Sequence, residues 1–384
     1  MAGWLDSVGR REALGFSLCG FAVSSVAAGM SPVPAWLVGA RLMQGAFGAV
    51  LFSLVPALAA TAVRPQARGR AMALITTLGP LGLISGPALG GLLIDALGWP
   101  WIFFVNVPVS IVVAAVGLSL LPAGAPLRLP DRAWFAECAL LTGAVGALLL
   151  ALTFTTSRGP AWLLLALCSA PLIARWARSP GSAPLRQLVR APGTVGPHIA
   201  LSSVAAAIGV VFFIAPFFAQ RQLGASASAA GAAVLAFPAG MALAGPVGGL
   251  LGDWWGSRRA AVLGAAIFTV GLVLLAPMDT AWTLPDLAWR LALAGCGNGL
   301  FNAPNMATVM TRTPPLLLAT TGASTTLART LGFALGPALA TLLWSTDSFG
   351  SDGMQRAVAA AAVLSALSIA AVARGSAANA RPSC

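Results

Sequence analysis

Residues 249–259 read Gly249-Leu250-Leu251-Gly252-Asp253-Trp254-Trp255-Gly256-Ser257-Arg258-Arg259. This polar stretch separates two long apolar runs, 228–251 and 260–277. The length of each run is close to the roughly 20 apolar residues that cross one bilayer as a helix. An aspartate and two arginines packed between such runs are typical of a tight loop at the membrane surface. The stretch therefore predicts a helical hairpin in a membrane protein.

The whole chain follows the same pattern. Of its 384 residues, 58% are hydrophobic and 8% are charged, with a mean hydropathy of +0.88. Soluble proteins are roughly 25% charged, so a water-soluble enzyme is excluded. The fold class expected is an all-α polytopic membrane protein with twelve helices. The apolar runs predict them at 13–29, 36–61, 70–94, 100–121, 133–154, 161–177, 195–219, 228–251, 260–277, 285–310, 318–344 and 355–374.

The basic residues test this count, because cytoplasmic loops are rich in Lys and Arg. All 22 are arginine, and the net charge is +12. Sixteen lie on one side: Arg10, Arg11, Arg64, Arg68, Arg70, Arg128, Arg132, Arg175, Arg178, Arg186, Arg190, Arg258, Arg259, Arg312, Arg374 and Arg381. The other side holds Arg158, Arg221 and Arg356, and three arginines lie within helices. The bias predicts an inner-membrane protein with both termini in the cytoplasm, and the positive charge needs no nucleic-acid partner.

Two landmarks recur along the chain. The stretch from Trp4 to Arg11 resembles 251–259, with Asp6 and Asp253 offset by 247. The phrase Gly86-Pro87-Ala88-Leu89 recurs at 336–339, at an offset of 250. Nearly equal offsets predict duplicated halves, as in transporters built from parallel repeats. Two helices precede the loop in the second half and none in the first, so we expect that two helices are missing; the alternative is an asymmetric protein.

On these residues the chain resembles the major facilitator superfamily, specifically its fourteen-helix drug:proton antiporter family. The family's loop G-x-L-a-D-r-x-G-R-r matches 249–259 well and the first copy poorly. The resemblance implies gating loops, in which the aspartate accepts hydrogen bonds from a neighbouring helix start. The gating residues expected are Asp6, Gly9, Arg10, Arg11, Gly249, Asp253, Gly256, Arg258 and Arg259. An ordinary positively charged loop is the other interpretation.

Two helix motifs extend the resemblance. Arg41-Leu42-Met43-Gln44-Gly45 looks like the family's R-x-x-Q-G, whose arginine is associated with proton coupling. An arginine within a helix is costly unless it is paired or hydrated, although Arg41 could also snorkel to the outer surface.

The segment 79–91 resembles the antiporter signature G-x-x-x-G-P-x-x-G-G, which marks exporters; simple close packing is the alternative. Its motif residues here are Gly82, Gly86, Pro87, Gly90 and Gly91. The segment 97–108 also looks like a family phrase, with Pro100 in place of the usual arginine.

Other polar residues within helices are candidates without a motif. Asn298, Asn302 and Asn305 share one face of a helix, and we expect them to line a substrate cavity or to bond neighbouring helices. Asp286 can pair with Arg290 at i,i+4 on the helix 285–310. Arg329 lies near the centre of 318–344 without an evident acidic partner, so it joins Arg41 and Gln44 as a proton-coupling candidate.

Together these features predict a secondary active transporter that exports small drug-like compounds against inward proton flow, by alternating access. The domains expected are a first bundle (1–122), two linking helices (123–192), a six-helix bundle (193–375) and a cytoplasmic tail (376–384). We expect a monomer that acts on a small-molecule substrate and protons, with no cofactor, metal site, nucleic-acid partner or enzymatic activity. The alternatives are a truncated chain that needs upstream helices or a partner, and a proton-coupled uptake permease.

Overall fold

A computed structural model describes residues 8–62, 86, 89–122, 124, 126, 132–313, 317–346 and 350–374. In this part of the chain, every regular element is a helix. The chain divides into two compact units, Met1–Phe135 and Ala136–Cys384.

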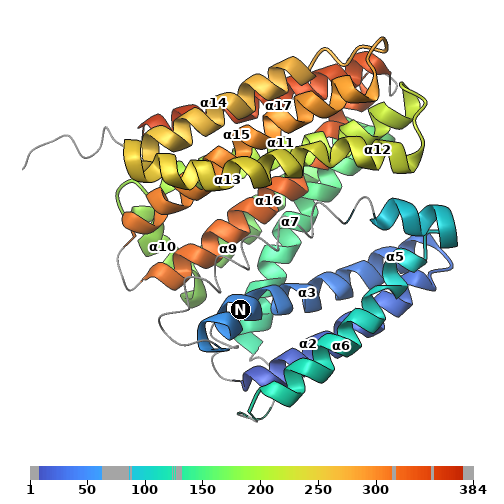
Figure 1. Cartoon of the computed structure of the whole chain (residues 1–384). Coiled ribbons are helices and arrows are strands. Elements are labelled where there is room, and N and C mark those ends of the chain that lie inside the picture. Colours follow the sequence, from blue (N-terminus) through green and yellow to red (C-terminus); the bar gives the residue numbers. More distant parts are fainter. Residues whose placement is uncertain are drawn as a thin grey trace, which may run out of the picture. The chain divides into compact units, whose positions relative to one another are not determined.

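The second unit contains the long helices of the C-terminal half (Figure 1). They are α11 (Val195–Arg221), α12 (Ala227–Val234), α13 (Ala236–Trp255), α14 (Ser257–Leu275), α15 (Leu284–Thr311), α16 (Leu318–Ser345) and α17 (Ser351–Arg374). Most of α7 (Arg132–Arg158) and the short helices that follow it also belong to this unit. The short helices are η2 (Pro160–Leu163), α8 (Leu164–Leu167), α9 (Ser169–Ala177), η3 (Pro180–Ser182) and α10 (Ala183–Arg190).

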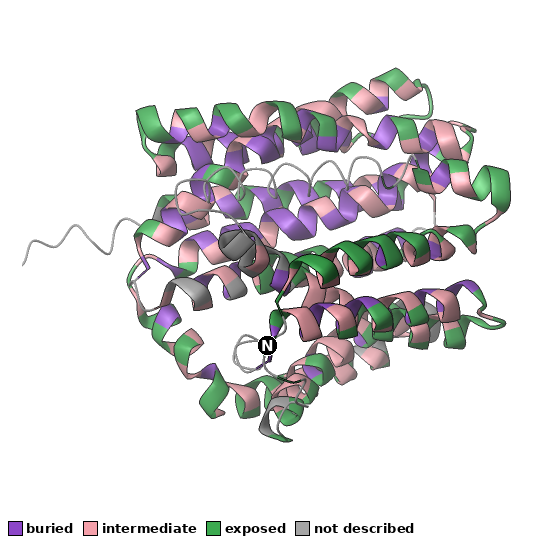
Figure 2. Cartoon of the chain, turned by 60° about the horizontal axis from the view of Figure 1, so that its bottom comes forward, coloured by how far each residue is buried: buried purple, intermediate pink, exposed green. Residues whose placement is uncertain are grey.

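Two sets of helices make the core of the second unit. α15 packs against α13 and α14, and α11 packs against α16 and α17. Residues on the faces where these helices meet are mostly buried, and Figure 2 colours the buried residues purple. Phe218, Phe237, Phe268 and Phe301 are fully buried there. Because lipid is as apolar as these side chains, close packing rather than the hydrophobic effect holds such helices together.

Small residues permit this close packing. A Cβ on Gly336 of α16 would lie 2.5 Å from the Cα of Gly209 in α11, so the two backbones touch. A Cβ on Gly295 of α15 would lie 1.9 Å from the carbonyl oxygen of Phe237 in α13. Gly336 belongs to the second copy of the repeated Gly-Pro-Ala-Leu phrase, so this phrase is a helix-packing surface in the second unit.

The first unit contains fewer described helices. They are α2 (Arg10–Gly29), α3 (Pro34–Ala62), α5 (Trp101–Phe104) and α6 (Asn106–Leu120), and residues 89–97 are also helical. α2 packs against α3 and α6 around a small core that includes Leu14, Leu18 and Leu54. Beside this core lies an apolar cavity of about 560 Å³ between leucines of α2 and α3 and valines of α6.

Most of the predicted helices correspond to helices of the structure. Nine described segments are long and apolar enough to span a membrane. The predicted helix 161–177 differs, because the chain there forms η2, α8 and α9, with a turn at Cys168. Pro171 lacks the N–H that would continue the ladder across this turn. Most of the predicted helix 70–94 lies outside the described residues.

Candidate functional site

Arg41 lies in α3 and is oriented by a chain of polar contacts. Its Nη1 donates to Oε1 of Gln44 at 3.0 Å, and the guanidinium carbon lies 4.6 Å from the ring centroid of Phe103 in α5. Nε2 of Gln44 donates to the Ser25 hydroxyl at 2.7 Å, and Ser25 in turn donates to the carbonyl of Phe21 in α2. Gln44 is 4% exposed and Ser25 is fully buried. The arginine is therefore held by dipoles and an aromatic face, and no carboxylate among the described residues pairs with it.

The sequence indicated Arg41 and Gln44 but missed Ser25 and Phe103. Ser24 and Ser25 stand together in the largely apolar run 13–29, and this pair was the available signal. Ser24 donates to the backbone of its own helix, whereas Ser25 also accepts from Gln44. Only the tertiary contact between α2 and α3 distinguishes the two serines.

The three asparagines of α15 make different contacts. Nδ2 of Asn302 donates to Oδ1 of Asn298 at 3.1 Å, and Nδ2 of Asn298 lies 3.1 Å from the sulfur of Met241 in α13. Asn305 is buried and donates to the carbonyl of Pro197 in α11 at 3.3 Å. Asn298 and Asn305 thus bond neighbouring helices. This is the second of the two roles expected for the asparagines on this helix face. Asn302 is half-buried.

Arg329 lies in α16 with an exposed side chain, and it makes no hydrogen bond or ion pair with the described residues. The two threonines before Arg329 do not bond its side chain, because the hydroxyls of Thr325 and Thr326 both donate to the carbonyl of Gly322. An arginine in an apolar helix without a partner is free to interact with an anionic or polar group that reaches it.

The third helical arginine, Arg290, is fixed in place at the start of α15. The predicted i,i+4 pair with Asp286 is confirmed, with Nη1 3.5 Å from Oδ1. The same nitrogen donates to the Asp286 carbonyl at 2.7 Å, and the guanidinium carbon lies 3.9 Å from the ring centroid of Trp282 and 4.4 Å from that of Trp289. Asp286 also completes a capping box with Thr283. This arginine anchors the loop before α15.

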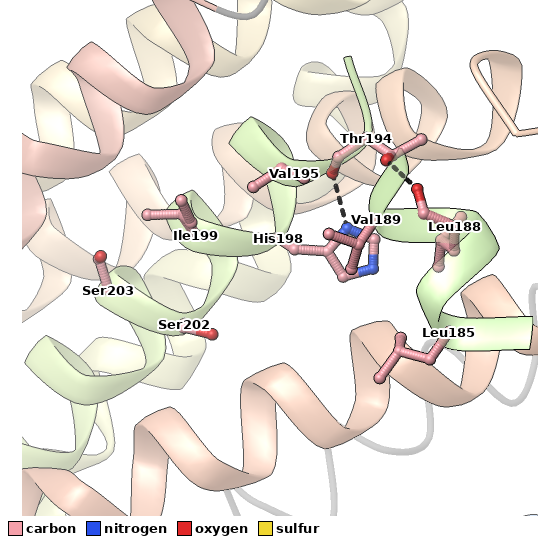
Figure 3. Close-up of a pocket in the computed structure, with 9 residues that line it drawn as sticks. All are labelled: Leu185, Leu188, Val189, Thr194, Val195, His198, Ile199, Ser202 and Ser203. Atoms are coloured by element: carbon pink, nitrogen blue, oxygen red, sulfur yellow. Dashed lines mark hydrogen bonds between the residues drawn. The ribbon is translucent and has the colours of Figure 1, made fainter. Parts of the chain in front are cut away.

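A pocket of about 280 Å³ opens at the start of α11 (Figure 3). Side chains of α10 and α11 line it, and Figure 3 shows the ring of His198 among them. Nδ1 of His198 lies 2.8 Å from the carbonyl oxygen of Thr194, and Nε2 lies 2.8 Å from the hydroxyl of Ser324 in α16. Thr194 donates to the Leu188 carbonyl at 2.6 Å, which ties α10 to the start of α11.

The predicted gating loop of the second unit is a one-residue turn. α13 ends at Trp255 and α14 begins at Ser257, with Gly256 between them at φ +87°, a conformation that favours glycine. Asp253 is exposed and accepts no hydrogen bond from the described residues, so the contact expected of it is not seen there. Arg258 instead donates to the carbonyl of Ala373 at the end of α17. The motif itself begins at Gly249, which is half-buried within α13, and ends at Arg259 of α14, which is exposed.

The other motif residues are only partly described. Asp6, Gly82 and Pro87 lie outside the described residues. Gly9 precedes α2, and Arg10 and Arg11 form its first turn. Gly86 has open space beside it, Gly91 is buried, and a Cβ on Gly90 would make ordinary contact with Ile102 at 3.8 Å.

Among known proteins, the chain is similar to transporters. It is 27% identical over 345 residues to the riboflavin transporter RibZ of Clostridioides difficile (strain 630), covering 87% of this chain and 73% of that protein. It is 25% identical over 354 residues to the tetracenomycin C resistance and export protein of Streptomyces glaucescens, covering 89% of this chain and 65% of that protein. It is 30% identical over 363 residues to the multidrug resistance protein Stp of Mycobacterium tuberculosis (strain CDC 1551 / Oshkosh), covering 89% of this chain and 66% of that protein. The chain thus spans slightly less than two thirds of the length of the latter two.

The fold and the family agree. A crystal structure of the peptide transporter POT in complex with sulfate superposes with a TM-score of 0.68 at 17% sequence identity, covering 97% of this chain and 82% of that one. This likeness concerns the fold alone. The sequence also matches the family model of the Major Facilitator Superfamily, over residues 1–192 and 197–381. This chain is therefore a multi-pass membrane transporter of the Major Facilitator Superfamily.

Proposed function

We propose that this chain is a secondary active exporter of small drug-like or natural-product compounds, driven by inward proton flow. The observation that carries the proposal is the buried Gln44–Ser25 contact, which holds Arg41 inside a membrane-spanning segment. Family membership and the similarity to export and multidrug resistance proteins support the direction and the substrate class.

Arg41 acts in this proposal as a cation whose surroundings change with transport state. Its partners are an amide and an aromatic ring, and both interactions are weaker than a buried ion pair. A carboxylate that loses its proton nearby would compete for the guanidinium, and a protonated one would release it. Arg329, in the other unit, is a second cation within a helix, and it makes no ion pair or hydrogen bond with the described residues. Of the three asparagines on this face of α15, the half-buried Asn302 is best suited to meet a substrate.

We further propose that the two units are repeats within the fourteen-helix drug:proton antiporter family. Arg41-Leu42 and Arg290-Leu291 lie 249 positions apart, as do Leu51-Phe52 and Leu300-Phe301. The helices α3 and α15 that carry these pairs have 29 and 28 residues. On this alignment α2, α3 and α6 correspond to α14, α15 and α17, and α7 to α9 form the extra pair between the halves. The two loops after Asp6 and Asp253 would then gate the cytoplasmic side of a monomer in the inner membrane, with both termini in the cytoplasm.

The exposed faces of the first unit support a fuller first half in the working transporter. Leu42 is 67% exposed and Phe52 is 70% exposed, whereas Leu291 and Phe301 at the matching positions are fully buried. In the second unit, α13 and α11 pack against α15 and so help to cover these positions. We infer that two further helices, from a longer chain or a partner, cover the first unit in the same way.

The test is efflux from vesicles of known pH gradient that contain the chain, with ethidium as a lipophilic cationic probe. We expect native chain to expel ethidium only when protons can flow inward, and Arg41→Ala to reduce the rate at least tenfold. Arg356→Ala removes an exposed arginine that bonds Thr346 and serves as the matched control. Equal efflux by native chain and Arg41→Ala would remove Arg41 from the mechanism.

A proton-coupled uptake permease is the second candidate, and the similarity to a riboflavin transporter favours it. Riboflavin is fluorescent, so its movement can be followed in the same vesicles. Accumulation of riboflavin with the proton gradient, without ethidium efflux, would replace export by uptake.

A further inference from the structure

His198, the single histidine of the chain, bridges two helices. It lies in the first turn of α11, and its Nδ1 and Nε2 lie 2.8 Å from the Thr194 carbonyl oxygen and 2.8 Å from the Ser324 hydroxyl, respectively. The Ser324 hydroxyl also lies 3.0 Å from the carbonyl oxygen of Thr321 in its own helix. Both ring nitrogens therefore have a partner.

The hydrogen-bond partners of His198 can be satisfied with a neutral ring and with a charged ring. A carbonyl can only accept, so Nδ1 carries a hydrogen in every state. The Ser324 hydroxyl has one hydrogen, which it donates either to Nε2 or to Thr321. With a neutral ring, Ser324 donates to Nε2. With a charged ring, Nε2–H donates to Ser324, whose hydrogen turns to Thr321. Every group is satisfied in both states, so the ring can take up a proton when one hydroxyl rotates.

We propose that His198 is a proton-binding site of the transporter, and that proton binding strengthens the cytoplasmic contact between α11 and α16. This inference rests on the proposed proton coupling and names a residue for it. The contact changes from a neutral hydrogen bond to a charge-assisted one, which is roughly twice as strong. The same two helices are also joined by Ser202, whose hydroxyl donates to the Ala328 carbonyl at 3.1 Å.

The surroundings suit a site that must also release its proton. The pocket of about 280 Å³ has room for several water molecules beside the ring, and His198 is its only ionisable lining residue within the described part of the chain. The ionisable residues at this end of the surrounding elements are Arg186 and Arg190 of α10, Arg312 after α15, Arg329 of α16 and Arg374 of α17. Glu137 of α7 is engaged by the backbone N–H of Gly181. Among the described residues, none of these charged groups makes an ion pair with the ring.

The first test reads the proton directly. Because there is one histidine, the purified chain with ¹⁵N-labelled histidine in lipid nanodiscs gives the ring signals of His198 alone. We expect the neutral ring to carry its hydrogen on Nδ1, because Thr194 can only accept, and Nε2 to gain a hydrogen as the pH falls. A neutral ring with its hydrogen on Nε2 would overturn the proposal.

A pair of serine variants tests the role of Ser324. In Ser324→Ala the charged ring loses more than the neutral ring, so its titration midpoint should fall by roughly half to one pH unit. Ser203→Ala is the matched control, because Ser203 also lines the pocket but has no hydrogen bond to the ring. An unchanged midpoint in Ser324→Ala overturns the proposal.

Transport then tests the coupling role. The native rate should change with cytoplasmic pH around the midpoint of the ring, and His198→Gln should lose this step. An unchanged pH profile in His198→Gln would overturn the coupling role. The ring titration needs no transported substrate, so it reads the proton site even where vesicles show no proton-driven efflux.

Discussion

At the scale of single residues, two arginines with similar sequence surroundings have different environments. Arg290 has a carboxylate partner, Asp286, and two tryptophan rings, so its cost within an apolar helix is offset at a fixed position. Arg41 has an amide and one phenylalanine ring. Its weaker partners leave Arg41 the better candidate for a cation that changes partners during transport.

Gln44 provides a residue-scale prediction. Gln44→Ala removes the contact with buried Ser25 and leaves that hydroxyl without its donor. We expect a loss of about 1–3 kcal/mol in the free energy of unfolding, measured as thermal unfolding in detergent, together with reduced proton-driven efflux because Arg41 is no longer oriented.

Gln220→Ala is the matched control for that change. Gln220 is exposed, and among the described residues its side chain bonds the backbone of its own helix alone, at Pro216. We expect its removal to change stability by less than about 0.5 kcal/mol. Equal losses in the two variants would contradict the role assigned to the Gln44–Ser25 contact.

At the scale of helices, α11 and α16 are held together by backbone approach. Gly209 and Gly336 occupy the point of contact, where a Cβ on Gly336 would lie 2.5 Å from Gly209. Such close approach strengthens dispersion contacts, which replace the hydrophobic effect as the source of helix association in lipid. It also brings Ser324 within reach of His198, so the packing of the two helices positions the proposed proton site.

Gly336→Ala tests this packing. The added methyl group must push α11 and α16 apart, and we expect a loss of about 1–3 kcal/mol in unfolding free energy. Gly322→Ala, in the same helix, meets nothing within 4 Å and should be neutral or stabilising by up to about 1 kcal/mol. Thermal unfolding of the two variants side by side gives the comparison. A harmless Gly336→Ala would show that the helices do not approach this closely.

At the scale of the whole molecule, the two units differ in how far their helices are covered. The second unit has a large core along α11 and α15, whereas the first has a small core beside an apolar cavity of about 560 Å³. Positions on α3 and α15 that the proposed repeat aligns have opposite exposure, as with Leu42 and Leu291. The proposed pair of covering helices would remove this difference.

The leucine pair tests that difference. Leu291→Ala should cost about 2 kcal/mol or more, because a fully buried side chain leaves a cavity. Leu42→Ala in this chain should cost well under about 1 kcal/mol, because lipid or detergent fills the space. Unfolding in detergent gives both values. A Leu42→Ala loss as large as that of Leu291→Ala would mean that the face is already covered.

The membrane class, the superfamily and most of the helices follow from the amino-acid sequence alone. Long apolar runs have one stable form in lipid, since every backbone polar group must be bonded within the segment. The sequence also made Arg41 and Gln44 candidates and predicted the pairing of Asp286 with Arg290, because spacing along one helix brings such residues together. The partners across helices depend on the tertiary packing. Ser25 and Phe103 beside Arg41, Asn305 at Pro197, and Ser324 at His198 depend on how helices distant in sequence pack, and helix periodicity carries no information about which neighbour a face will meet.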